Sequence, residues 1–193
     1  MFSGSHDTSA TRSLFGGHRL SHIFGALLLT LHGYCAAAPA QADSGDYDLK
    51  AAFIARFVEF IDWPSTASEG HSFSICVFGE HPIQLPLAKL PGLLTAKGNN
   101  VEIRRIAQPQ EAAECDILFI PSNAAENLPA IRNAIQSNPV LTISDTPGFV
   151  QRGVLINFFT EDDRLRFEIQ LPHARAAGLT VSSRLLKLAR VIE

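Results

Sequence analysis

The first regular pattern after the N-terminal segment is helical. Over residues 46–62, apolar side chains recur every three or four positions, acidic groups occupy the first turn, and a Trp-Pro pair follows the last apolar position. This spacing, with acidic residues at the start and a proline at the end, is typical of an amphipathic helix. We therefore expect one face of this segment to lie in the core.

Short apolar runs with the composition of strands come next. They cover residues 73–78, 116–120 and 140–144. Residues 101–106 have a more alternating pattern that also predicts a strand, while residues 124–136 return to helical spacing. Runs of this length that are rich in Val, Ile and Phe favour buried strands. Strands that alternate with helices favour a parallel sheet covered on both faces. The expected fold class is therefore α/β, a three-layer sandwich built on a mostly parallel, Rossmann-like sheet.

The last quarter of the chain breaks this alternation. Residues 154–159 and 165–169 flank a polar loop, residues 160–164, so they most simply form an antiparallel hairpin. Successive side chains of a strand point to opposite faces of its sheet. The second strand should bury its apolar residues on one face and present a charged set on the other, formed by Arg164, Arg166 and Glu168.

Two terminal helices are expected after the hairpin. Pro172 opens a short one that Gly178 closes, and Ser182 or Ser183 caps a final helix whose apolar positions extend to Ile192. Proline suits the first turn of a helix, and a serine hydroxyl accepts a hydrogen bond from an otherwise unpaired backbone N–H there.

The N-terminal segment has the pattern of a secretory signal. Arg19 precedes an apolar run, residues 23–31, which small residues follow at 36–42. A membrane-spanning helix needs about 20 apolar residues, roughly twice the length of this run. We expect residues 1–42 to be an N-terminal extension with a signal peptide, and residues 43–193 to be the exported domain. A retained membrane anchor and a cytosolic chain with an apolar first helix are the alternatives.

Composition excludes two classes of protein. With 46% hydrophobic and 18% charged residues the chain is not intrinsically disordered. The net charge is -3 and no block of basic residues occurs, so nucleic acid is not an expected partner.

Two cysteines remain after residue 42, Cys76 and Cys115. An even number of cysteines in an oxidising compartment favours a disulfide between them. Cys76 lies within its predicted strand and Cys115 just before the next, so a bridge requires an offset in register. Two buried thiols that pack as small hydrophobic groups are the alternative.

Signatures of enzymes are missing from the sequence. It has no glycine-rich nucleotide loop, zinc-protease motif, serine-hydrolase elbow or C-x-x-C pair. The histidines after residue 42, which are His71, His81 and His173, fall in predicted loops or a short turn, where a surface role is favoured over acid–base catalysis. Adjacent carboxylates in residues 161–163 favour a solvated turn over a metal site. No cofactor or metal is expected.

The end of one predicted strand is a candidate ligand-binding site. Ser144 and Asp145 end a predicted strand at the edge where open parallel sheets bind small molecules. The simpler interpretation of residues 145–148 is a turn in which Asp145 bonds its own backbone. A small-molecule sensor that uses Ser144 and Asp145 is kept as an alternative function.

Segments along the whole exported part resemble the YfiR family. They are residues 50–54, 57–64, 73–79, 115–122, 141–149, 156–158, 166–169 and 177–186. The resemblance implies a small periplasmic regulator of a Gram-negative bacterium, without catalytic activity. It implies a repressor that binds the periplasmic part of an inner-membrane diguanylate cyclase, lowers cyclic di-GMP, and is released through an outer-membrane OmpA-like lipoprotein. A disulfide between Cys76 and Cys115 and a homodimer are also implied.

A regulator without catalytic groups acts through its surface. The candidate partner-binding residues are Arg164, Arg166 and Glu168 on the charged hairpin face. A second candidate set is formed by Phe57, Phe60 and Trp63 at the end of the first helix. The alternative interpretations are a solvated strand surface for the charges and core packing for the aromatic residues.

Overall fold

The long helix α1 (Ser44–Phe60) packs against one face of an eight-stranded sheet. This computed structural model describes residues 44–64, 72–91, 95–96, 99–136 and 138–193, all within the unit Gln41–Glu193. The predicted amphipathic helix is confirmed, because Ile54, Phe57 and Val58 are buried in the core. The predicted signal peptide lies outside the described residues.

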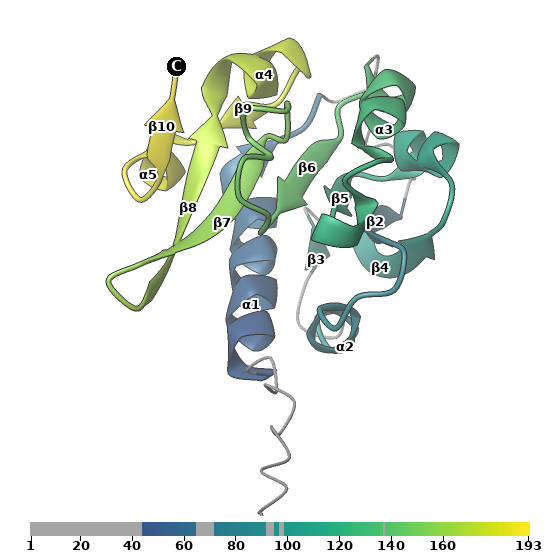
Figure 1. Ribbon diagram of the computed structural model, residues 1–193, viewed down its shortest axis with the longest axis horizontal. Coiled ribbons are helices and arrows are strands. Elements are labelled where there is room, and N and C mark those ends of the chain that lie inside the picture. The colour runs from purple at the N-terminus through teal and green to yellow at the C-terminus, as the bar shows by residue number, and fades with distance from the viewer. Residues whose placement is uncertain (1–43, 65–71, 92–94, 97–98, 137) are drawn as a thin grey trace, which may run out of the picture. The chain divides into compact units, whose positions relative to one another are not determined.

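The sheet has the order β10-β8-β7-β6-β5-β2-β4-β3 (Figure 1). Its centre is parallel and consists of β4 (Asn99–Ile106), β2 (Phe73–Phe78), β5 (Ile117–Phe119), β6 (Leu141–Ser144) and β7 (Ile156–Glu161). The remaining strands are β3 (Thr95–Ala96), antiparallel to β4; β8 (Arg164–Gln170), antiparallel to β7; and β10 (Arg190–Ile192), parallel to β8. A mostly parallel sheet with an antiparallel hairpin is therefore confirmed.

Alternate residues of the central strands β2 and β5 pack into two separate cores. In β2, Ile75 and Val77 join the core under α1, whereas Cys76 and Phe78 join the other. The second core is covered by the helix α3 (Leu128–Ile135) and the 3-10 helices η2 (Pro109–Glu114) and η3 (Ser122–Ala124). The short helix α2 (Gln84–Leu87) follows β2. The three-layer α/β sandwich is confirmed.

The hairpin between β7 and β8 is tighter than predicted. Strand pairing continues to Glu161↔Arg164, so only Asp162 and Asp163 form the turn instead of residues 160–164. Both have positive φ, 50° and 55°. Two consecutive positive φ values suit the right-handed twist of paired strands, and Asp tolerates this conformation. In Figure 1 the hairpin tip reaches past the ends of the neighbouring strands.

Two predicted helices are shorter in the structure. The helix expected over residues 124–136 begins at Leu128, with proline in its first turn. The hairpin is followed by α4 (Leu171–Ala176) and by β9 (Thr180–Val181), which pairs with β1 (Ile61–Asp62). The last helix, α5 (Ser183–Leu186), is a single turn. Ser182 caps it as expected, but its predicted extension to Ile192 is wrong. That segment forms β10, because the open edge of β8 supplies backbone partners.

The disulfide between Cys76 and Cys115 is present. Their Cα atoms lie 6.0 Å apart. In the parallel pairing of β2 with β5, Cys76 lies opposite Leu118, so Cys115 precedes that position by three residues. This is the offset in register that the sequence required. Both cysteines are buried in the second core, and the bridge ties η2 and β5 to the middle of β2.

Candidate functional site

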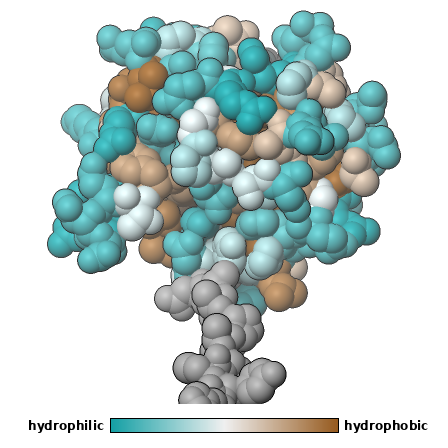
Figure 2. All heavy atoms as spheres, in the orientation of Figure 1, coloured by the Kyte–Doolittle hydropathy of each residue, from teal (hydrophilic) through white to brown (hydrophobic). Residues whose placement is uncertain are grey.

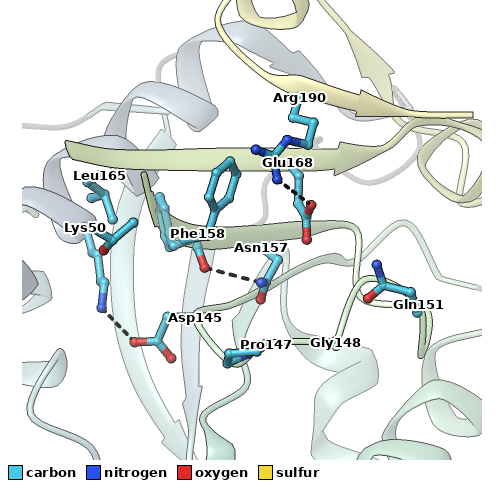
Figure 3. A pocket seen from close by; sticks show the side chains of 12 residues that line it. Lys50, Asp145, Pro147, Gly148, Gln151, Asn157, Phe158, Leu165, Glu168 and Arg190 are labelled. Atoms are coloured by element: carbon cyan, nitrogen blue, oxygen red, sulfur yellow. Dashed lines mark hydrogen bonds and ion pairs between the residues drawn. The ribbon is translucent and has the colours of Figure 1, made fainter. Parts of the chain in front are cut away.

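A cleft lies where β6 ends and β7 continues beyond it, paired only with β8. Only Ile143 and Ser144 of β6 pair with β7, so the later residues of β7 lack a neighbour on that side. The uncovered space has a volume of about 460 Å³ and is bordered by α1, the loop after β6, β7, β8 and β10 (Figure 3). Clefts at the carboxyl ends of parallel strands are common ligand sites in open α/β sheets.

An ion pair closes one end of this cleft. The Nζ atom of Lys50, from α1, lies 2.8 Å from the carboxylate of Asp145 and 2.6 Å from that of Asp46. Burial lowers the pKa of Lys50, but its hydrogen bonds and charge interactions with Asp145 and Asp46 outweigh that effect, so the pKa is raised overall. The pair fastens the loop after β6 to the first helix.

The predicted ligand residues take different positions. Ser144 is fully buried, and its Oγ accepts a hydrogen bond of 3.1 Å from the backbone N–H of Thr146. Asp145 lines the cleft but is paired with Lys50. Ser144 therefore shapes the turn. Ligand binding through these two residues stays a prediction.

The opposite end of the cleft is a row of three polar residues on neighbouring strands. Asn157 of β7 lies opposite Glu168 of β8, which lies opposite Arg190 of β10. Asn157 is 2% exposed, and its Nδ2 donates to the carbonyl of Phe158 at 3.2 Å. Arg190 lies 2.6 Å from the Glu161 carboxylate, and its guanidinium is stacked over the ring of Phe159 at 4.1 Å.

His81 is half-buried rather than a surface residue. Its ring packs edge-on against Tyr47 and tilted against Phe119, with centroids 5.2 and 5.1 Å away. Burial lowers its pKa, and the nearby charge of Lys50 lowers it further against the opposing effect of Asp145. His81 is therefore more enclosed than the sequence predicts, because its ring packs against side chains of α1 and β5.

The charged hairpin face is open to solvent. Arg164 and Arg166 are exposed, and the guanidinium of Arg166 lies 3.8 Å from Glu161 across the hairpin. The Glu168 side chain is only 12% exposed. Figure 2 shows a largely hydrophilic surface in this view, with hydrophobic residues scattered over it. Of the three predicted contact residues on this face, the two arginines are therefore the most accessible to a partner.

The predicted aromatic set separates into core and margin. Phe57 is fully buried between the rings of Phe158 and Phe167, so it presents no surface. Phe60 and Trp63 are half-buried. The Nε1 of Trp63 donates to the backbone carbonyl of Asp116 at 3.3 Å.

A family comparison decides the classification. A family model described as YfiR/HmsC-like matches residues 47–190. The chain belongs to this family. The resemblance read from the sequence is therefore confirmed.

Two solved structures match parts of this YfiR/HmsC-like chain. A crystal structure of a conserved domain protein from Vibrio cholerae O1 biovar El Tor matches with a TM-score of 0.51 and 13% identity, over 76% of this chain and 60% of that one. An ABC domain in complex with L-Trp from Streptococcus pneumonia matches with a TM-score of 0.47 and 16% identity, over 72% and 60%. The first likeness supports the α/β fold.

The YfiR/HmsC-like domain offers neither a membrane span nor a clustered metal site in its described parts. Across the residues that the structure describes, every helix is too short or too polar to cross a bilayer. In the same residues, His, Cys, Asp and Glu side chains form no group of three that could hold a metal ion.

Sequence reasoning missed the polar row of Asn157 and Arg190. Arg190 lay in a segment expected to be helical, so its place beside β8 was not anticipated. Asn157 interrupts an apolar run, residues 154–159. A lone amide in a buried strand was the available signal, because a buried polar group needs a partner.

Proposed function

We propose that this YfiR/HmsC-like protein binds the periplasmic sensor segment of an inner-membrane diguanylate cyclase and holds the enzyme inactive. The observation that carries the proposal is the family match over residues 47–190. A protein without catalytic groups shifts its partner by binding one conformation more tightly than the other. A change from mostly active to mostly inactive cyclase requires about 5 kcal/mol of differential affinity.

The contact surface in this proposal is centred on Arg164 and Arg166. Their place on a projecting hairpin supports the assignment, because exposed arginines in reach of solvent can pair with acidic groups of a partner. Glu168, Phe60 and Trp63 border it as lesser contacts. Phe57, which is fully buried, contributes by stabilising the folded domain rather than by contact with the partner.

Delivery and release complete the proposal. Residues 1–42 direct export to the periplasm of a Gram-negative bacterium, and residues 43–193 act there as the regulatory domain. An outer-membrane OmpA-like lipoprotein removes the repressor from the cyclase, and the repressor acts as a homodimer.

Reversing the charge of both hairpin arginines should abolish capture of the cyclase. The double variant Arg164→Glu, Arg166→Glu should recover the cyclase from solubilised membranes at least about tenfold less well than the wild type, because each substitution removes one attraction and adds one repulsion. The measurement is co-purification with a tagged chain. Arg175→Glu, an exposed arginine on α4, is the matched control and should recover the cyclase normally. Unchanged recovery by a folded double variant would contradict this contact surface.

A second candidate function is a small-molecule sensor that acts on a different membrane signalling partner. The cleft beside Asp145 favours it, because the cleft is large enough for a small ligand. A cyclase that co-purifies would favour repression, and a ligand-dependent change of partner would favour the sensor.

A further inference from the structure

One buried acceptor in the cleft lacks a donor. The Oδ1 atom of Asn157 is buried and has no hydrogen-bond partner among the described residues, although the amide nitrogen of the same side chain is paired. An unpaired buried acceptor costs about 1–3 kcal/mol, and most such groups in folded proteins are satisfied. Asn157 is 2% exposed and lines the cleft. The described part of the chain therefore leaves this buried oxygen able to accept a hydrogen bond from a ligand in the cleft.

The neighbouring group is also an acceptor. Glu168 lies directly across the strand pair from Asn157, and Figure 3 shows both side chains on the wall of the cleft. The cation beside Glu168 is Arg190, whose Nη1 is 4.0 Å from the Glu168 carboxylate and whose Nη2 is closer to Glu161. The loose pair leaves the carboxylate able to accept a shorter hydrogen bond. An amide oxygen and a carboxylate side by side select a donor with positive charge.

The rest of the cleft limits the size and character of the ligand. Its volume of about 460 Å³ falls among small-molecule sites. Phe158, Phe159 and Leu165 contribute apolar contact, and Lys50, paired with both Asp145 and Asp46, closes the far end. A short carbon chain with an ammonium group fits this combination.

We propose that the cleft binds a small organic ammonium ion whose N–H groups donate to Asn157 Oδ1 and to the Glu168 carboxylate. The ligand satisfies the buried amide oxygen and replaces the distant contact of Glu168 with a direct ion pair. This site lies beside, and does not include, the exposed hairpin arginines. It goes beyond the proposed repression and does not depend on it, because binding requires no cyclase.

Thermal unfolding with matched amine and alcohol probes tests the site. The probes are butane-1,4-diamine and n-butylamine, compared with butane-1,4-diol at equal ionic strength, on the chain purified from the periplasm. The melting temperature should rise with either amine and stay constant with the diol, because a ligand that binds only the folded state stabilises it by mass action. Amide chemical-shift changes should centre on residues 157 and 168.

Two variants assign the effect to the proposed acceptors. Asn157→Leu keeps the approximate volume and removes the acceptor, and Glu168→Gln keeps the shape and removes the charge. Each should weaken amine binding at least about tenfold, equivalent to 1.4 kcal/mol. Asn133→Leu and Glu126→Gln, both exposed and outside the lining of the cleft, are matched controls that should bind as the wild type.

Specific outcomes would overturn the proposal. They are the absence of any amine binding, equal or tighter binding of the diol, or wild-type affinity in Glu168→Gln together with unchanged shifts at residue 157. If Asn157→Leu does not fold, Glu168→Gln and the shift mapping still decide. Cyclase capture is not measured, so failure of this site leaves the repression proposal intact, and the reverse also holds.

Discussion

Reducing the disulfide between Cys76 and Cys115 should lower the free energy of unfolding by about 4 kcal/mol. The two cysteines are 39 residues apart, so the oxidised unfolded chain is confined to a closed loop that reduction opens. In the chain-entropy model, closing a 15-residue loop stabilises a protein by about 3 kcal/mol and closing a 100-residue loop by about 4.7 kcal/mol, so this loop falls between them. An average domain is stable by only about 5–15 kcal/mol, so reduction should remove a large share of the free energy of unfolding.

Urea unfolding of the oxidised and the reduced protein measures this effect without changing any side chain. The midpoint should fall by about 2 M if the slope is near 2 kcal/mol per molar urea. Both cysteines are buried, so complete reduction has to be verified by thiol counting in urea. Equal midpoints for the oxidised and reduced forms would show that the bridge contributes no stability.

Replacing Phe57 by alanine should cost about 3–5 kcal/mol of stability. Phe57 is fully buried on α1, and its ring centroid lies 5.2 Å from that of Phe167 and 5.9 Å from that of Phe158. Truncation leaves a cavity where the helix meets both strands of the hairpin. The measurement is again urea unfolding, with the slope checked for two-state behaviour.

Phe60→Ala is the matched control for this cavity. Phe60 is half-buried and three positions further along the same helix, so its loss should cost clearly less. A cost below about 1 kcal/mol for Phe57→Ala would contradict its place in the core. Loss of cyclase binding in Phe57→Ala that follows the loss of folded protein would show that Phe57 acts through stability rather than by contact.

Local patterns predicted most of this fold. Buried runs such as residues 73–78 and 140–144 are recognisable as strands because they are short, apolar and contain β-branched residues. Their alternation with helices decides the parallel sheet. The pairing of Cys76 with Cys115 follows from the even number of cysteines after residue 42 and the oxidising compartment expected for the chain. The structure adds the three-residue offset in register that allows the bridge.

Long-range pairing is what the sequence did not predict. Residues 190–192 have the composition of a helix end, and they become a strand only because β8 has an open edge beside them. Lys50 and Asp145 are separated by 95 positions, so no local pattern links them. The row from Asn157 to Arg190 depends on strand register. A shift of one residue in the pairing would move these side chains to the other face of the sheet.

Cellular cyclic di-GMP tests the central claim most directly. The account predicts that deleting the gene raises the cyclic di-GMP level severalfold, that the wild-type chain restores it, and that the Arg164→Glu, Arg166→Glu chain does not, although it accumulates in the periplasm. An unchanged level after deletion would contradict repression of a diguanylate cyclase by this protein.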